Sequence, residues 1–171
     1  MDTTHAYSKE DWLVHTHYGV GQIKDIEVKA ISGKDVQYFR IQANDCTYWM
    51  PVSKMDNLKI RPLSSIEEIR LVIDILQRPP KEMSPDHLVR KNRIRSVQLK
   101  NVPEDIARLV RDLRARQRDK GKYNVDEYHV VRMLKQRLVD EWSIVTGENE
   151  DKVKTELEAL INHQPLPEDV N

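Results

Sequence analysis

The pattern of hydrophobic residues changes near residue 64, and this change constrains the fold more than any other feature of the chain. Before it, short runs with β-type alternation are separated by turn signals such as Gly19, Gly21 and Ser32-Gly33-Lys34. After it, apolar residues recur every three or four positions, as they do in an amphipathic helix. A chain that is first β-rich and then helical is typical of the α+β class, here with two domains.

Five runs in the first part carry the strand signal: residues 11–16, 21–31, 35–42, 46–52 and 58–63. Runs of this length and spacing predict a small, strongly bent β-barrel or sheet. In the second part, Ser65 and Glu68 have the spacing of a capping box, and Pro79-Pro80 ends that helix. Ser84-Pro85 indicates a second helix start. The remaining boundary signals are Pro103, Gly121, Asn124, Gly147 and Asn149.

These signals divide the chain into three parts. We expect a β-rich domain over residues 1–64, a helical domain over residues 65–162 and a flexible tail over residues 163–171. The single cysteine, Cys46, excludes an internal disulfide and fits a reducing compartment. The N-terminus lacks the pattern of a signal peptide, and no apolar stretch approaches the roughly 20 residues that span a bilayer. A soluble cytoplasmic protein without membrane contact is therefore expected.

The charge of the chain is unevenly distributed, although its net charge is zero. Residues 86–122 hold 12 Lys/Arg against 5 Asp/Glu, a net charge of +7, whereas residues 123–171 hold 5 against 11, a net charge of −6. A concentrated positive segment attracts polyanions such as nucleic acids. The alternative is that these charges are solvated or pair with the acidic segment that follows.

The stretch VHTHYGVGQI, residues 14–23, allows three interpretations. A phosphate-binding loop would need a helix directly after its glycines, and the next run here is β-type. His15 and His17 could offer two metal ligands from one strand face, but the sequence supplies no evident third ligand. The glycines are therefore expected to permit a bend beside a partly buried polar face. No catalytic pattern is evident either, so we expect no enzyme activity, metal, cofactor or small-molecule substrate.

Two longer stretches resemble a known family. The first half contains VHTHYGVGQIKDIE and SGKDVQYFRIQANDCTYWMPVSKMDNLKIRPL, and the second half contains ARLVRDLRARQRDKGKYNVDEYHVVRMLKQRLVDE. The first two resemble the RNA polymerase-interacting domain of the CarD/CdnL family of bacterial transcription regulators, a module that also occurs in transcription-repair coupling factors. The third resembles the helical domain of CarD-like proteins. The resemblance covers roughly residues 8–162.

The resemblance implies a Tudor-like β-barrel that binds the polymerase β subunit by strand-to-strand contact. It also implies a helical domain that touches promoter DNA at the upstream fork, without sequence specificity, and stabilises the open complex. Such a protein would be associated with the nucleoid. Two alternatives stay open: a polymerase-docking module without firm DNA contact, and a small nucleic-acid-binding protein with no role in transcription.

On the polymerase side, the resemblance implies contacts at Lys29 and Trp49, with Met50 and Pro51 beside Trp49 on the same predicted strand. At position 49 some relatives have arginine in place of tryptophan. An exposed Trp49 would suit a protein interface, because tryptophan is enriched among the residues that dominate binding energy. A Trp49 packed inside the barrel would instead have a structural role.

On the DNA side, His87 stands where the family has a tryptophan that wedges into the minor groove. Histidine offers less apolar area, so either the wedge is weaker here or DNA binding depends on phosphate contacts. Alternatively, His87 is only a surface residue at the start of a helix. The phosphate contacts are expected from Arg90, Lys91, Arg93 and Arg95, which lie on more than one helix face. We expect two or three of them to reach DNA and the rest to pair with acidic neighbours.

Overall fold

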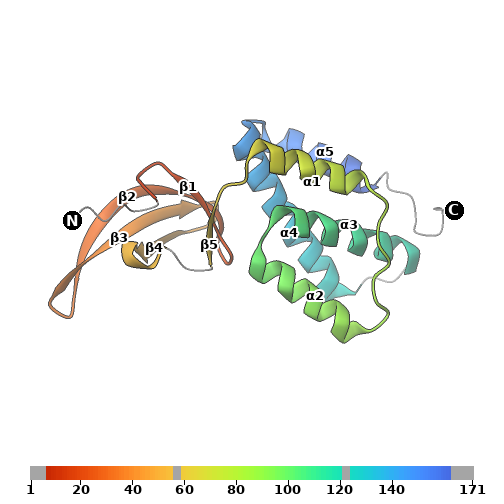
Figure 1. Ribbon diagram of the computed structural model, residues 1–171, viewed down its shortest axis with the longest axis horizontal. Coiled ribbons are helices and arrows are strands. Elements are labelled where there is room, and N and C mark those ends of the chain that lie inside the picture. The colour runs from red at the N-terminus through yellow and green to blue at the C-terminus, as the bar shows by residue number, and fades with distance from the viewer. Residues whose placement is uncertain (1–6, 56–58, 121–123, 163–171) are drawn as a thin grey trace. The chain divides into compact units, whose positions relative to one another are not determined.

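The computed structural model describes residues 7–55, 59–120 and 124–162. The chain divides into two compact units, Met1–Leu63 and Ser64–Asn171. All the strands lie in the first unit and all the α-helices in the second (Figure 1). The expected α+β layout is therefore confirmed.

The first unit is one antiparallel sheet with the strand order β4-β3-β2-β1-β5. Its strands are β1 (Trp12–His15), β2 (Gly19–Ile31), β3 (Lys34–Ala43), β4 (Thr47–Pro51) and β5 (Ile60–Pro62). A short 3₁₀ turn, η1 (Val52–Lys54), follows β4. In Figure 1, β2 and β3 form a long, curved hairpin. Across the described residues β4 and β5 are the two edges and do not pair, so the sheet is open and a closed barrel is not confirmed.

The core of this unit follows from the alternation along the strands, since successive side chains point to opposite faces. One face of β3 is fully buried at Phe39 and Ile41, and Leu13 and Ile23 complete the centre of the cluster. A bulge at Ile23/Asp25 shifts the register between β2 and β3. Beyond it the hairpin extends away from this core, and Val28 on β2 is 60% exposed.

The two glycines of the HTHYGVG stretch have different roles. Gly19 is the first residue of β2, directly after the turn from β1, and its φ of +74° confirms the expected bend there. Gly21 lies within β2, where an added Cβ would come 2.8 Å from the Cγ2 atom of Ile41. The expectation of a bend was wrong for Gly21, because what requires a glycine is the close approach of β3.

His15 and His17, which could have shared one strand face, do not do so. His15 ends β1 and is 5% exposed, and its Nδ1 accepts hydrogen bonds from the backbone N–H groups of His17 (3.0 Å) and Tyr18 (3.3 Å). The His15 ring therefore holds the turn into β2, and His17 belongs to that turn. No group of three potential metal ligands occurs among the described residues.

The second unit contains five helices: α1 (Ile66–Gln77), α2 (His87–Lys100), α3 (Pro103–Lys120), α4 (Val125–Thr146) and α5 (Glu150–Asn162). The capping box at Ser65 and Glu68 is confirmed, since both reciprocal hydrogen bonds are present. The predicted start at Ser84-Pro85 was wrong by two residues. Asp86 is the N-cap of α2, because its carboxylate accepts from the N–H of Leu88 at 2.7 Å.

The other helix signals in the described residues are confirmed. Pro103 is the first residue of α3, and the Asn124 and Asn149 side chains cap α4 and α5. Gly147 ends α4 with a φ of +71°. Gly121 lies outside the described residues, as does the predicted tail after residue 162.

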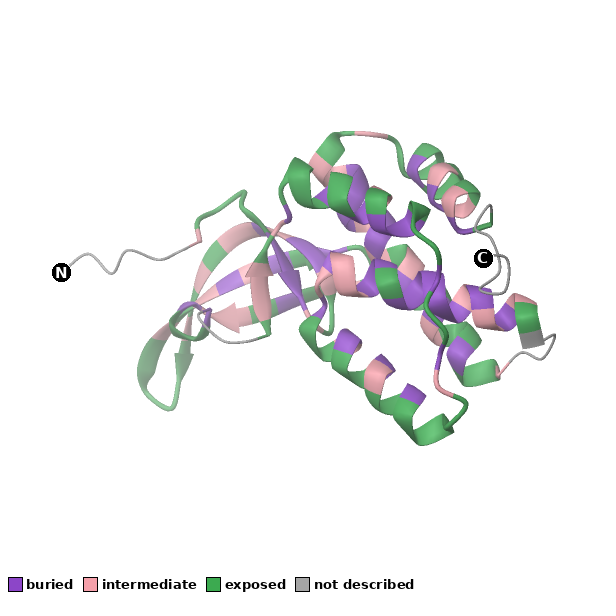
Figure 2. Ribbon diagram, turned by 45° about the vertical axis from the view of Figure 1, so that its right-hand side comes forward, coloured by how far each residue is buried: buried purple, intermediate pink, exposed green. Residues whose placement is uncertain are grey.

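The apolar stripes of the helices meet in one core around Trp142, Leu109 and Leu134. Figure 2 shows the buried positions gathered on the sides of the helices that face one another. The buried carboxylate of Glu141 on α4 accepts from the N–H of Ser64 at 2.9 Å, which attaches the start of this unit to its core. Within the described part of the chain, no helix has the length and apolar character that crossing a bilayer would require.

Candidate functional site

Lys29 on β2 and Trp49 on β4 were each predicted as contact residues, and their side chains meet across β3. The Lys29 Nζ atom is 4.2 Å from the centroid of the Trp49 ring and 5.7 Å from that of Tyr38. This is the geometry of a cation–π contact. Trp49 is 43% exposed, so the alternative of a tryptophan packed inside the sheet is wrong.

Glu27 on β2 makes polar contacts with three side chains of this surface. Its carboxylate accepts a hydrogen bond from Nε1 of Trp49 at 2.8 Å and lies 3.1 Å from Nε of Arg40 and 3.8 Å from Nζ of Lys29. The indole is thereby held at a fixed position before any partner arrives. We call this surface the Trp49 face, made of Glu27, Lys29, Tyr38, Arg40 and Trp49. Sequence reasoning missed three of its members, because alternation gives the face of each residue but not which strands are neighbours.

The backbone of Trp49 is also available to a partner. The N–H of Ala43 donates to the carbonyl of Cys46 at 2.9 Å, which makes these two residues a hydrogen-bonded pair at the start of the β3–β4 ladder. Such pairs alternate along an antiparallel ladder. The alternation turns the N–H and C=O of Trp49 away from β3, toward the open edge of β4. Trp49 therefore presents an indole beside a strand edge that pairs with no other described strand.

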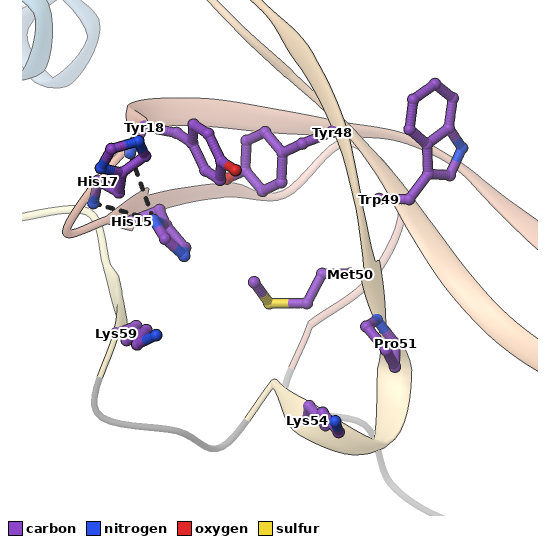
Figure 3. A pocket seen from close by; sticks show the side chains of 9 residues that line it. All are labelled: His15, His17, Tyr18, Tyr48, Trp49, Met50, Pro51, Lys54 and Lys59. Carbon is purple, nitrogen blue, oxygen red and sulfur yellow. Dashed lines mark hydrogen bonds between the residues drawn. The ribbon is translucent and has the colours of Figure 1, made fainter.

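Met50 and Pro51 line a cavity of about 410 Å³ next to this edge. Figure 3 shows the Met50 side chain projecting into the cavity, whereas the Trp49 indole points away from its centre. The lining residues are His15, His17, Tyr18, Tyr48, Trp49, Met50, Pro51, Lys54 and Lys59. The two lysines and the aromatic rings give the cavity a positive and largely apolar wall.

Tyr48 forms the fixed part of that wall. Its ring stacks on Tyr18 at 4.3 Å, and His15 meets it edge-on at 5.7 Å. The hydroxyl of Tyr48 is buried and has no hydrogen-bond partner among the described residues. Burial raises the pKa of this hydroxyl above its ordinary value, with smaller contributions from Cys46 and Tyr18, so Tyr48 stays neutral.

In the helical unit, the structure places Arg90 away from solvent. Arg90 is 6% exposed, and its Nε is 2.7 Å from Oε1 of Glu127, which is 5% exposed. The guanidinium also donates to the carbonyl oxygens of Ser84 (2.9 Å) and Pro85 (2.7 Å). A group whose donors are used in this way is not available to a phosphate. Arg90 instead holds α2 against α4.

Arg93 is also paired inside the unit. Its Nη2 is 2.6 Å from Oδ2 of Asp112, a fully buried carboxylate that also accepts from Arg111 and from the N–H of Lys81. The expectation that some of the four cations pair with acidic neighbours is confirmed for Arg90 and Arg93. Glu127 and Asp112 are structural residues that the sequence did not reveal, because both lie far along the chain from their partners.

The remaining candidates lie on a single groove. His87, Lys91 and Arg95 are exposed on one side of α2, and they face the first turns of α4 across a groove of about 330 Å³. We call it the α2–α4 groove; it is lined by His87, Lys91, Ile94, Arg95, Gln98, Asp126, Glu127 and Val130. Spacings of four residues place the three candidates on the same helix face. The sequence therefore predicted part of this surface, but not its opposite wall.

The sequence of the first unit matches a known class of domain. Residues 7–64 match the family model of the CarD-like/TRCF RID domain, and this unit is a CarD-like RNA polymerase-interacting domain. Over 151 residues the chain is 23% identical to the "Putative transcription factor YdeB" of Bacillus subtilis (strain 168). That alignment covers 85% of this chain and 95% of the relative, so the similarity extends into the helical unit.

Proposed function

We propose that this protein is a transcription regulator that binds the RNA polymerase β subunit through its sheet and contacts promoter DNA through its helical unit. In this proposal it has no enzymatic activity and acts in the cytoplasm, at the nucleoid. The observation that carries the proposal is the Lys29–Trp49 pair beside the open edge of β4. The match of residues 7–64 to the CarD-like/TRCF RID domain makes RNA polymerase the partner expected at this edge.

The polymerase contact is proposed to be strand addition at β4. An exposed sheet edge binds an extended segment through backbone hydrogen bonds, while neighbouring side chains provide specificity. Trp49 supplies both parts, and the cavity beside Met50 and Pro51 can receive side chains of the added strand. A tryptophan held by Glu27 loses little conformational freedom on binding, which favours affinity.

The DNA contact is proposed for residues that face solvent. Lys91 and Arg95 are exposed and form no hydrogen bond or ion pair with the described part of the chain. They can therefore bind phosphates without breaking an existing pair, unlike Arg90 and Arg93. His87, at the N-terminus of α2, is proposed to lie at the upstream fork and to help stabilise the open complex.

The proposal assigns one role to each unit. Residues 1–64 would bind polymerase as a Tudor-like, partly open barrel whose β4 edge stays free for the added strand. Residues 65–162 would contact DNA without sequence specificity, since the exposed cations address phosphates and not base pairs.

Capture of core polymerase by the full-length chain tests the first half of the proposal. Lys29→Glu with Trp49→Ala should weaken capture about 30-fold or more, as loss of a central hot spot does. Trp12→Ala is the matched control, because Trp12 is a 37% exposed tryptophan on β1 that does not line the cavity. Equal capture by all three proteins, with equal melting curves, would refute the assignment of this face.

Open-complex decay at fixed salt tests the second half. His87→Ala should shorten the lifetime of the complex. His87→Trp should lengthen it, because the larger apolar ring of tryptophan stabilises an unstacked base step better. Normal polymerase capture with no effect of the protein on decay would favour the second candidate, a docking module without firm DNA contact. Identical lifetimes for the native protein and both variants would show that His87 is only a surface residue.

A further inference from the structure

The polar side chains of the outer lining of the α2–α4 groove differ from three arginines packed inside the helical unit. Arg90, Arg93 and Arg111 are all held in ion pairs. In contrast, the side chains of the groove's outer lining make no hydrogen bond or ion pair with the described part of the chain; they are His87, Lys91, Arg95, Gln98 and Asp126. A surface that collects unpartnered donors and acceptors is suited to a polar ligand.

The two walls of the groove carry opposite chemistry. The α2 wall presents the cations Lys91 and Arg95 one helical turn apart, about 6 Å along the axis. The α4 wall presents the carboxylate of Asp126, held by the capped first turn of that helix. A bare phosphate would be attracted by the first wall and repelled by the second. The ligand that fits both walls has a negative part and a hydrogen-bond donor.

The floor of the groove is apolar. Ile94, which is 8% exposed, and the half-buried Val130 lie between the walls, and the volume of about 330 Å³ is at the lower end of the range for small-ligand sites. The buried Arg90–Glu127 pair lies beneath and fixes the separation of the two helices. A flat, apolar ring can therefore rest on this floor with its polar edge toward α4.

We propose that the α2–α4 groove binds one unpaired base of single-stranded DNA, with Lys91 and Arg95 at the flanking phosphates and Asp126 accepting a hydrogen bond from the amino group of the base. Within a duplex that amino group is paired and stacked, so only an unpaired base can enter. The inference rests on the proposed function only in taking DNA as the ligand of the helical unit. It adds that the protein contacts the melted strand and prefers bases with an exocyclic amino group.

Fluorescence anisotropy of the full-length chain with oligodeoxycytidine and oligothymidine of equal length tests this inference. The two oligonucleotides have the same phosphates, so the difference in affinity between them reports the base. Cytosine carries an amino donor at N4 that thymine lacks. We expect oligodeoxycytidine to bind roughly fivefold tighter, as one charge-assisted hydrogen bond at a partly exposed site provides.

Asp126→Ala should bring this ratio close to one, and should strengthen binding of oligothymidine because a negative charge is removed. The matched control is Asp151→Ala. Asp151 has the same position in α5 as Asp126 has in α4. The N–H of each donates to the side-chain oxygen of a capping asparagine, at 2.8 Å for Asp151 and 2.9 Å for Asp126, but Asp151 does not line the groove. This control should keep the ratio of the native protein.

Three results would overturn the inference: no binding of single strands, equal affinity for both oligonucleotides, or a ratio that persists in Asp126→Ala. Equal affinity would mean that the groove acts through charge alone, and a persisting ratio would mean that Asp126 does not read the base. Melting curves of both variants confirm that they fold. Polymerase capture, measured separately, depends on the other unit, so a failure of this inference is distinguishable from a failure of the proposed function.

Discussion

Removal of the Glu127 carboxylate should destabilise the helical unit more than a typical substitution does. Glu127 pairs with Arg90 at 2.7 Å, and both residues are at least nine-tenths buried. Because Arg90 also donates to the carbonyl oxygens of Ser84 and Pro85, its guanidinium cannot turn toward water without losing these bonds. Glu127→Ala therefore leaves a buried charge without its partner, which costs about 3–5 kcal/mol.

Two companion variants separate the charge from the packing. Glu127→Gln keeps the shape and one acceptor, so we expect a smaller loss of about 1–3 kcal/mol. The double variant Arg90→Met/Glu127→Leu leaves no buried charge and should lose less than Glu127→Ala. The expected order of stability is native, then Glu127→Gln, then Glu127→Ala.

The measurement must report on the helical unit alone, because two compact units can unfold separately. Trp142 is 2% exposed in the core of that unit, whereas Trp12 and Trp49 lie in the sheet. With Trp12→Phe and Trp49→Phe as background, urea unfolding followed by tryptophan emission reports only on Trp142. A Glu127→Ala variant within about 0.5 kcal/mol of the native protein would refute the reasoning, since that is the range of ordinary surface substitutions.

Three further predictions concern the sheet and helix α2. Gly21→Ala forces a Cβ to within 2.8 Å of a β3 methyl carbon and should destabilise the sheet by about 1–3 kcal/mol in urea unfolding; an unchanged midpoint would contradict this. Because burial raises the pKa of the Tyr48 hydroxyl, the folded state keeps its proton longer than the unfolded state, and the free energy of unfolding should fall as the pH rises above 10.0. Tyr48→Phe should remove that part of the pH dependence. On duplex DNA, Lys91→Ala and Arg95→Ala should each reduce the slope of log affinity against log salt by about 0.9. Lys100→Ala is the control and should not reduce it, because Lys100 lies outside the groove. Equal effects of all three variants would refute specific contacts.

The sequence was most informative about local structure. Strand alternation, helix periodicity and capping residues depend on neighbours within a few positions, so the order of the elements and most helix starts could be predicted. The exception at α2 shows the limit of such signals. Ser84, Pro85 and Asp86 all suit a helix start, and only the hydrogen bond from Leu88 identifies Asp86 as the cap.

Among the site residues, the sequence identified the residue types but not their surroundings. Trp49 and Lys29 were predicted from a family resemblance, and helical spacing separated Lys91 and Arg95 from Arg90 and Arg93. The burial of Arg90 could not be predicted, because its partner Glu127 lies on another helix. For the same reason, Glu27 and the α4 wall of the groove had no signal in the sequence.

The sequence by itself determined that this chain has a β part and an α part, with its positive charge on one stretch. Only the tertiary structure decided which of these charges are used internally and which face solvent. The physical reason is that a side chain's free energy depends on what lies across from it, and neighbouring strands and helices are brought together by long-range packing. Arg90 and Lys91 are adjacent in the chain, yet one lies in a buried ion pair and the other on an open groove.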